Sequence, residues 1–149
     1  MAAPESTESL RSILVPVDGS PASLQAVALA CDIARKNKGR VYVVHVIEVK
    51  RTLPLDAAMQ TEETAGDDVL AQAEELARKQ GFQVDGEILH ARDAGPAIVD
   101  EAIERAADLI IMGIGYQGPF GEFQLPRVVQ AVLKSSPCQV WVCREAVRE

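Results

Sequence analysis

The feature that most constrains the fold is an alternation between short apolar runs and longer segments whose apolar residues recur at helical spacing. A short apolar run that is bounded by turn residues predicts a buried strand. A helix between two such runs predicts a right-handed crossover and therefore parallel strands. The sequence thus predicts an α/β fold, with a doubly wound, mostly parallel sheet and helices on both of its faces. Strands are expected at 12–18, 40–47, 82–90, 108–113 and 139–143, and helices at 21–37, 64–80, 93–107 and 125–135.

A length of 149 residues suits one domain with a single core. Residues 1–10 are expected to form a disordered lead-in, residues 11–145 the folded domain and residues 146–149 a charged tail. Residues 48–62 show no clear period and contain Pro54, so they are expected to form a loop. The segment 82–90 is more polar than the other strands, which favours a position at the edge of the sheet.

The net charge of −7 argues against nucleic acid and anionic membranes as general partners, because an acidic surface repels both. No apolar stretch reaches the ~18 residues that a membrane span needs. The first ten residues lack the basic and apolar regions of a signal peptide, so a cytoplasmic location is expected. Cys31, Cys138 and Cys143 lack the spacing of a metal site and are expected to be free thiols.

Two strand ends carry the residues best suited to a ligand site, because ligands of open parallel sheets bind beyond the carboxyl ends of strands. The first strand ends at Asp18, whose carboxylate could accept hydrogen bonds from a ribose or an adenine amino group. Asp18 could equally order the following turn. The fourth strand leads into a loop with glycines at Gly113, Gly115, Gly118 and Gly121. Their amides could cradle phosphates, or the loop could be a lid or a turn.

The sequence predicts no catalytic residue and no metal ligand. His45 and His90 lie inside predicted strands, where a structural role is expected. The chain lacks the local signature of a Ser/His/Asp or Cys/His hydrolase. It also lacks a Walker Gly-Lys-Ser/Thr motif, and the acidic residue that would complete a dinucleotide-binding G-x-G-x-x-G is missing.

Four segments stand in order at characteristic spacings. They are Ile-Leu-Val-Pro-Val-Asp-Gly-Ser from Ile13, Val-His-Val-Ile from Val44, Ile98-x-x-x-Ala102 leading to Ala-Asp-Leu-Ile-Ile-Met-Gly ending at Gly113, and Val-Leu-Lys-Ser-Ser-Pro-Cys-Gln-Val from Val132. Together they resemble the universal stress protein family over residues 12–144. The resemblance implies a five-stranded parallel sheet in the order 3-2-1-4-5, of the adenine nucleotide alpha hydrolase-like kind. It also implies a homodimer, commonly formed through the last strand, here residues 139–143. Many members bind ATP or related adenine nucleotides, others do not, and their roles concern tolerance of stress.

The loop after the fourth strand departs from the pattern of nucleotide-binding members, which reads Gly, two residues, Gly, nine residues, Gly, and Ser or Thr. When this pattern is carried over, Tyr116 takes the second glycine position, and Pro126 and Arg127 take the closing pair. Gly115 and Gly118 could restore part of the pattern only with a shift of two positions. Since Pro126 offers no N–H and the closing hydroxyl is missing, tight ATP binding is predicted to be reduced or lost.

The resemblance gives the adenosine contacts to Asp18 and to the main chain of Val46. The leading hypothesis is a dimeric stress-response module that acts by binding rather than catalysis. The alternative is a protein that binds ATP or AMP with Mg²⁺ and has slow hydrolase or phosphotransfer activity. A flavin electron-transfer subunit or a nucleotidyl transferase is disfavoured, because the chain has five predicted strands and no His-x-Gly-His motif. The candidate nucleotide cleft comprises Asp18, Val46, Gly113, Gly115, Gly118 and Arg127.

Overall fold

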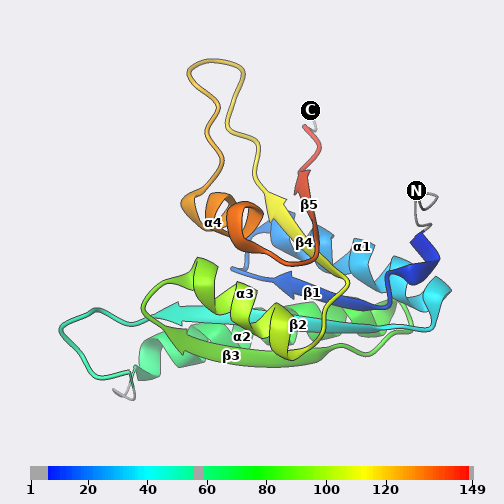
Figure 1. Ribbon diagram of the computed structural model, residues 1–149, viewed down its shortest axis with the longest axis horizontal. Coiled ribbons are helices and arrows are strands. Elements are labelled where there is room, and N and C mark those ends of the chain that lie inside the picture. The colour runs from blue at the N-terminus through cyan, green and yellow to red at the C-terminus, as the bar shows by residue number, and fades with distance from the viewer. Residues whose placement is uncertain (1–6, 56–58, 148–149) are drawn as a thin grey trace.

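A computed structural model describes residues 7–55 and 59–147 and has one parallel sheet of five strands in the order β3-β2-β1-β4-β5 (Figure 1). The fold class and the strand order expected from the sequence are therefore confirmed. The segment before β1 contains a 3-10 turn, η1. In chain order the elements are η1 (Thr7–Ser9), β1 (Ser12–Pro16), α1 (Pro21–Asn37), β2 (Arg40–Glu48), α2 (Gln60–Lys79), β3 (Asp85–Ala91), α3 (Ala94–Glu104), β4 (Leu109–Ile114), α4 (Arg127–Ser135) and β5 (Gln139–Arg144).

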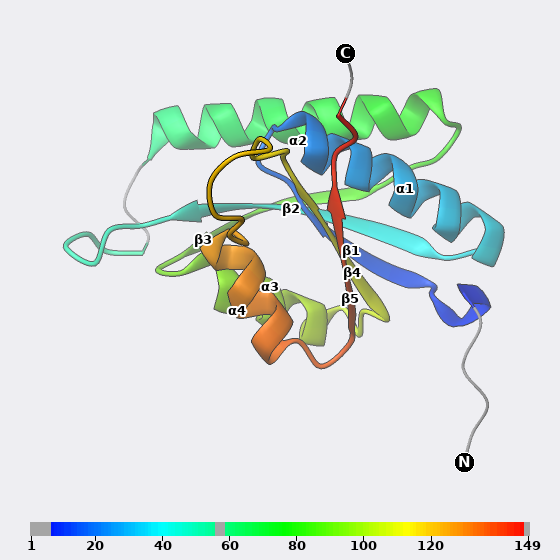
Figure 2. The same cartoon turned by 90° about the horizontal axis from the view of Figure 1, so that it is seen from above.

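The sheet is covered on both faces: α1 and α2 lie on one side, and α3 and α4 lie on the other (Figure 2). Successive side chains of a strand point to opposite faces, so a strand between two helical layers must be apolar throughout. In β1, Ile13 and Val15 pack under α1 and α2 whereas Leu14 packs under α3 and α4, and all three are fully buried. This double burial explains why the central strands read as continuous apolar runs.

Several boundaries differ from the sequence prediction, and the starts of α2 and β3 have a clear physical reason. Helix α2 begins at Gln60, so the predicted loop over 48–62 is wrong for its last residues. Glu62 and Glu63 lie in the first turn of α2, where carboxylates favour the positive end of the helix dipole. Strand β3 begins at Asp85 rather than at residue 82, because the N–H of Phe82 still donates to the Ala77 carbonyl and closes the end of α2 (3.0 Å).

The predicted disordered lead-in is wrong for residues 7–10. The η1 turn precedes Leu10, whose side chain is only 7% exposed and joins the core. The Asn37 side chain donates to the Leu10 carbonyl at 3.0 Å, which ties this segment to the end of α1. Apolar burial and this hydrogen bond order the segment, and the remainder of the lead-in, residues 1–6, lies outside the described residues.

The central strand β1 separates early from β4. It pairs with β2 at five positions, from Ser12 to Pro16, but with β4 at only two, Ile13 and Leu14. The winding of the sheet reverses between these strands, and at such a point the connections leave in opposite directions and open a crevice. The N-terminus of α1 packs directly against β4 at Gly113. A Cβ built on Gly113 would lie 2.1 Å from the Ala22 carbonyl oxygen.

This close approach predicts that Gly113→Ala destabilises the fold by about 1–3 kcal/mol, the usual cost of an overpacked contact. Gly115→Ala is the matched control, because a Cβ there would meet only the Glu145 carboxylate at 3.5 Å. We expect the control to change the free energy of unfolding by less than about 0.5 kcal/mol. Urea unfolding of both variants measures this, and equal losses would contradict the packing argument.

Candidate functional site

A cavity of about 270 Å³ lies at the carboxyl edge of the sheet, where β1 and β4 have separated. Its volume is near the lower end of the roughly 300–1,000 Å³ that is usual for small-molecule sites. The ends of β1, β2 and β4 and the first turns of α1, α3 and α4 contribute to it. The lining residues are Pro16, Val17, Asp18, Ser23, Val44, His45, Val46, Glu48, Ala94, Ile98, Met112, Gly113, Pro126, Val128 and Val129.

Asp18 lines this cavity and orders the turn between β1 and α1 at the same time. Its Oδ1 accepts the Ser20 N–H at 2.9 Å, and the Ser20 hydroxyl in turn accepts the Ser23 N–H at 3.2 Å as the N-cap of α1. Partial burial raises the pKa of Asp18, but hydrogen bonds from Ser20 and Ser23 outweigh it, so the net pKa lies below its usual value. The side chain is therefore held as a carboxylate at the mouth of the cavity.

The main chain of Val46 lies beyond the last rung between β1 and β2. The ladder ends at Pro16 and Val44, and the Val17 N–H donates to the Val44 carbonyl at 2.8 Å. Main-chain groups of alternate residues face the same neighbouring strand in a parallel sheet, so those of Val46 also face the β1 side. Val46 lines the cavity, at a point where the ladder between β1 and β2 has already ended.

His45 fastens the end of β1. Its Nδ1 lies 2.9 Å from the Val17 carbonyl, which can only accept, so Nδ1 carries the proton and donates. The ring packs under α2 at Gly66, where an added Cβ would lie 2.9 Å from the imidazole. The structural role expected for His45 is consistent with these contacts, although the ring also lines the cavity.

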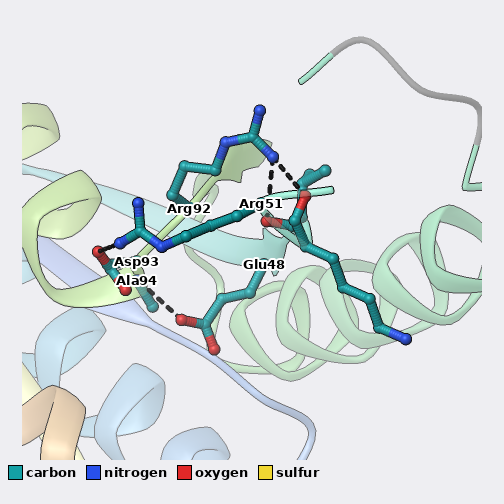
Figure 3. A network of polar contacts seen from close by, with 7 residues as sticks. Glu48, Arg51, Arg92, Asp93 and Ala94 are labelled. Carbon is teal, nitrogen blue, oxygen red and sulfur yellow. Dashed lines mark hydrogen bonds and ion pairs between the residues drawn. The ribbon is translucent and has the colours of Figure 1, made fainter. Parts of the chain in front are cut away.

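Glu48 is a cavity residue that the sequence analysis missed. Its Oε2 accepts the N–H of Ala94, the first residue of α3, at 3.2 Å (Figure 3). Next to it, Arg51 pairs with Asp93 at 3.4 Å. The position of Glu48 at the carboxyl end of a strand was the available signal, since that is where ligand sites of such sheets lie.

Arg92 forms hydrogen bonds with the connection between β2 and α2, next to Glu48 and Arg51 (Figure 3). Its Nη1 donates to the main-chain carbonyls of Val49 at 3.5 Å, of Lys50, and of Leu53 at 2.6 Å (Figure 3). A guanidinium carries several donors in a fixed geometry, so one side chain can satisfy several carbonyls of a turn. The guanidinium of Arg92 is therefore engaged in holding its own chain.

The loop between β4 and α4 projects away from the sheet (Figure 1). Two hydrogen bonds close its base: the Gln117 side chain donates to the Gln124 carbonyl at 2.7 Å, and the Gln124 N–H donates to Gln117 Oε1 at 3.2 Å. Neither Gly115 nor Gly118 lines the cavity. A part for these two glycines in a nucleotide cleft therefore stays a prediction, and Gly118, with a φ of +92°, lies in a turn.

Pro126 and Arg127, although adjacent in the chain, line two different cavities. Pro126 is the N-cap of α4, makes no side-chain cap, and lines the cavity. Arg127 lines a neighbouring cavity of about 330 Å³, together with Glu48 and Asp93. Of the six predicted residues, Asp18, Val46 and Gly113 share the main cavity and Arg127 lies next to it.

Within the described ranges, no helix is long and apolar enough to cross a membrane, and no group of three or more His, Cys, Asp or Glu residues could hold a metal ion.

A second polar group lies under the edge of the sheet, between β3 and α3. Glu101 is only 6% exposed, and Arg105 donates to it at 3.2 Å and to Glu87 at 3.0 Å. The Arg105 guanidinium also lies over the Tyr42 ring, 4.9 Å from its centre. Burial raises the pKa of Glu101, and a hydrogen bond with the Glu87 carboxyl raises it further, whereas Arg105 lowers it; the net pKa is above the usual value.

A Glu whose pKa is raised on folding contributes its full stabilisation at pH values below 4.5, its pKa in the unfolded chain. That contribution is lost as the pH rises through the raised pKa of the folded state. Glu101→Gln removes this titration. We therefore expect the stability of Glu101→Gln relative to wild type to increase as the pH rises above 4.5, as measured by urea unfolding at several pH values. Glu104→Gln, at the exposed end of the same helix, should show no such trend, and parallel curves for Glu101→Gln would contradict the assignment.

Known proteins match both the sequence and the fold. A universal stress protein of Methanocaldococcus jannaschii is 29% identical over 145 residues, which cover 93% of this chain and 85% of the relative. The solved universal stress protein of Archaeoglobus fulgidus superposes with a TM-score of 0.74 at 25% identity, covering 89% of this chain and 97% of that chain. A structure from the same organism in complex with dAMP gives 0.71 at 24% identity, covering 89% and 96%. The profile of the universal stress protein family matches residues 9–144, nearly the whole chain, and the chain therefore belongs to that family.

Proposed function

We propose that this universal stress protein acts by binding a small molecule, and that its cleft takes the adenosine part of a ligand while holding phosphates weakly. The observation that carries the proposal is that Asp18 and Val46 line one cavity, with Pro126 at the N-cap of α4 also in its lining. A carboxylate and the main chain of a strand beyond the end of its ladder suit the hydroxyls of a ribose and the polar edge of an adenine. The apolar lining, which includes Ile98 and Met112, suits the faces of the base.

Structural neighbours support an adenine ligand. The Archaeoglobus fulgidus universal stress protein has been solved with dAMP, so a protein of this fold accommodates an adenine nucleotide. Because its identity to this chain is 24%, the neighbour shows the fold, and the ligand of this chain must be argued from its own residues.

The phosphate side of the cleft is poor in donors. Pro126 has no N–H at the helix N-cap, and Arg127 replaces a hydroxyl that could donate there. Each hydrogen bond to a charged group contributes about 1.5–3 kcal/mol, so losing two would lower affinity by orders of magnitude. A hydrolase or phosphotransferase would need a triphosphate held firmly in line with a nucleophile, and this side of the cleft favours the binding module instead.

Titration calorimetry tests this proposal. Adenosine should bind measurably, and ATP with Mg²⁺ should bind with a Kd weaker than about micromolar. The double variant Pro126→Gly and Arg127→Ser restores an N–H and a hydroxyl, and should tighten ATP binding at least about tenfold without changing the affinity for adenosine.

Lys134→Ser is the matched control for the lost positive charge, because Lys134 lies in the last turn of the same helix. It should leave both affinities unchanged. Absence of adenosine binding at millimolar concentration, or micromolar ATP binding by the wild type, would refute the proposal.

We further propose that the protein is a homodimer paired through β5. Strand β5 is one edge of the sheet, and its side chains are already packed within the chain: Trp141 lies against the α1 side and Val142 against the α4 side. The open feature is therefore the main chain. The Glu145 N–H donates to the Ile114 carbonyl, so the N–H groups of Cys143 and Trp141, two and four positions before it, also face β4. The N–H group of Val142, which lies between them, faces away from β4.

Val142→Pro should convert the dimer to a monomer, because proline removes an outward N–H without breaking a bond to β4. Val142→Ala is the control and should remain dimeric, since it keeps that N–H. Light scattering at micromolar concentration should give twice the 16.0 kDa chain mass for wild type and Val142→Ala. A wild-type mass of one chain, or a dimer of Val142→Pro, would exclude pairing through β5.

A further inference from the structure

We propose that the cleft selects uncharged nucleosides over nucleotides, and that Glu48 is the residue that sets this preference. The inference rests on the proposed adenosine-binding function and specifies its ligand class. It follows from the charges around the cavity and from the hydrogen bonds that the nearby amide donors already make.

The first observation is the charge of the lining. Among the described residues that line the main cavity, the ionisable side chains are Asp18, His45 and Glu48, and no Lys or Arg is present. Two carboxylates at a partly enclosed site give a negative potential that low-dielectric walls strengthen. A phosphate monoester carries between one and two negative charges at neutral pH and must enter against this potential, whereas adenosine carries none.

The second observation is that three main-chain donors at this edge of the sheet are occupied by the chain's own carboxylates. Asp18 accepts the Ser20 N–H at 2.9 Å, and Glu48 accepts the Ala94 N–H at 3.2 Å. Glu145, beyond the end of β5, accepts the Tyr116 N–H at 3.1 Å. The α3 N-terminus, which would otherwise attract an anion, therefore already holds one in Glu48.

The third observation is that two arginines near Glu48 are engaged elsewhere. Arg51 pairs with Asp93, and Arg92 donates to the carbonyls of the β2–α2 connection (Figure 3). Arg127 lines the adjoining cavity, together with Glu48 and Asp93, and is not among the residues that line the main one. These three arginines are therefore either engaged by other groups or placed outside the main cavity.

Glu48 is the carboxylate whose removal tests the idea most directly. It lines both cavities, whereas Asp18 is needed for the proposed ribose or adenine contact. Glu48→Gln removes the charge and keeps an oxygen that can still accept the Ala94 N–H, so the α3 N-terminus retains its partner.

The experiment compares adenosine and AMP by titration calorimetry in wild type and Glu48→Gln. Wild type should bind AMP at least about tenfold more weakly than adenosine, and Glu48→Gln should close most of that gap by tightening AMP binding. Glu74→Gln, the same change on the exposed face of α2, should leave both affinities as in wild type. Thermal unfolding of each variant confirms that the fold is kept.

A second measurement needs no variant. Salt screens repulsion between charges, so the affinity of wild type for AMP relative to adenosine should rise as the salt concentration is raised from about 20 to 300 mM. A cleft that attracts phosphate would show the opposite trend.

The outcomes separate the inference from the function on which it rests. If adenosine binds more tightly than AMP but Glu48→Gln and salt both leave that ratio unchanged, the charge selection is wrong and the proposed function stands. If AMP binds as tightly as adenosine or more tightly, the charge selection is wrong and so is the weak hold on phosphate in the proposed function. If neither adenosine nor AMP binds, the proposed function fails and the inference fails with it.

Discussion

The architecture of the cleft depends on the short ladder between β1 and β4. Only two positions pair these neighbours, while β1 follows β2 to its end and β4 follows β5. Backbone groups released by an interrupted ladder must find partners or face solvent. Here the α1 N-terminus packs against Gly113, and Val46, beyond the end of the β1–β2 ladder, lines the cavity. A longer β1–β4 ladder would fill the space that the ligand site needs.

The two helical layers support that opening in different ways. On one side, His45 and Gly66 fit α2 closely against the end of β2. On the other side, Gly95 lies so close to Ala131 that a Cβ would come within 2.5 Å, which brings the first turn of α3 against the middle of α4. Small residues at such contacts let backbones approach, and the rigid walls that result keep a cavity open rather than letting it collapse. The tight contacts and the cavity are therefore parts of one packing arrangement.

Much of the fold could be predicted from the sequence because its signals are local. The apolar run from Ile13, the Ser20 cap and Pro21 identify the first strand and helix from neighbouring residues alone. Asp18 and Gly113 could be found in the same way, because the carboxyl ends of parallel strands converge whatever the side chains are. The start of α2 was harder, because residues near Pro54 carry little periodicity.

The missed parts depend on contacts between distant segments. Glu48 reaches Ala94 across 46 positions in the chain, and no spacing rule connects these two residues. The glycines of the β4–α4 loop matched a phosphate-loop pattern, yet the pairing of Gln117 with Gln124 directs that loop away from the cavity. Glycine content signals that a chain can turn, whereas the direction of the turn is decided by the partners of its flanking residues.

The closed base of the β4–α4 loop also has a practical consequence. Because Gln117 and Gln124 hold the two stems together, the tip between them, with Phe120 at 91% exposure, makes little demand on the rest of the domain. Exposed tips of this kind tolerate inserted sequence, and lengthening an already closed loop costs little chain entropy. The tip is thus a natural point for grafting an epitope or a fluorescent label that reports on the protein in cells while leaving the sheet undisturbed.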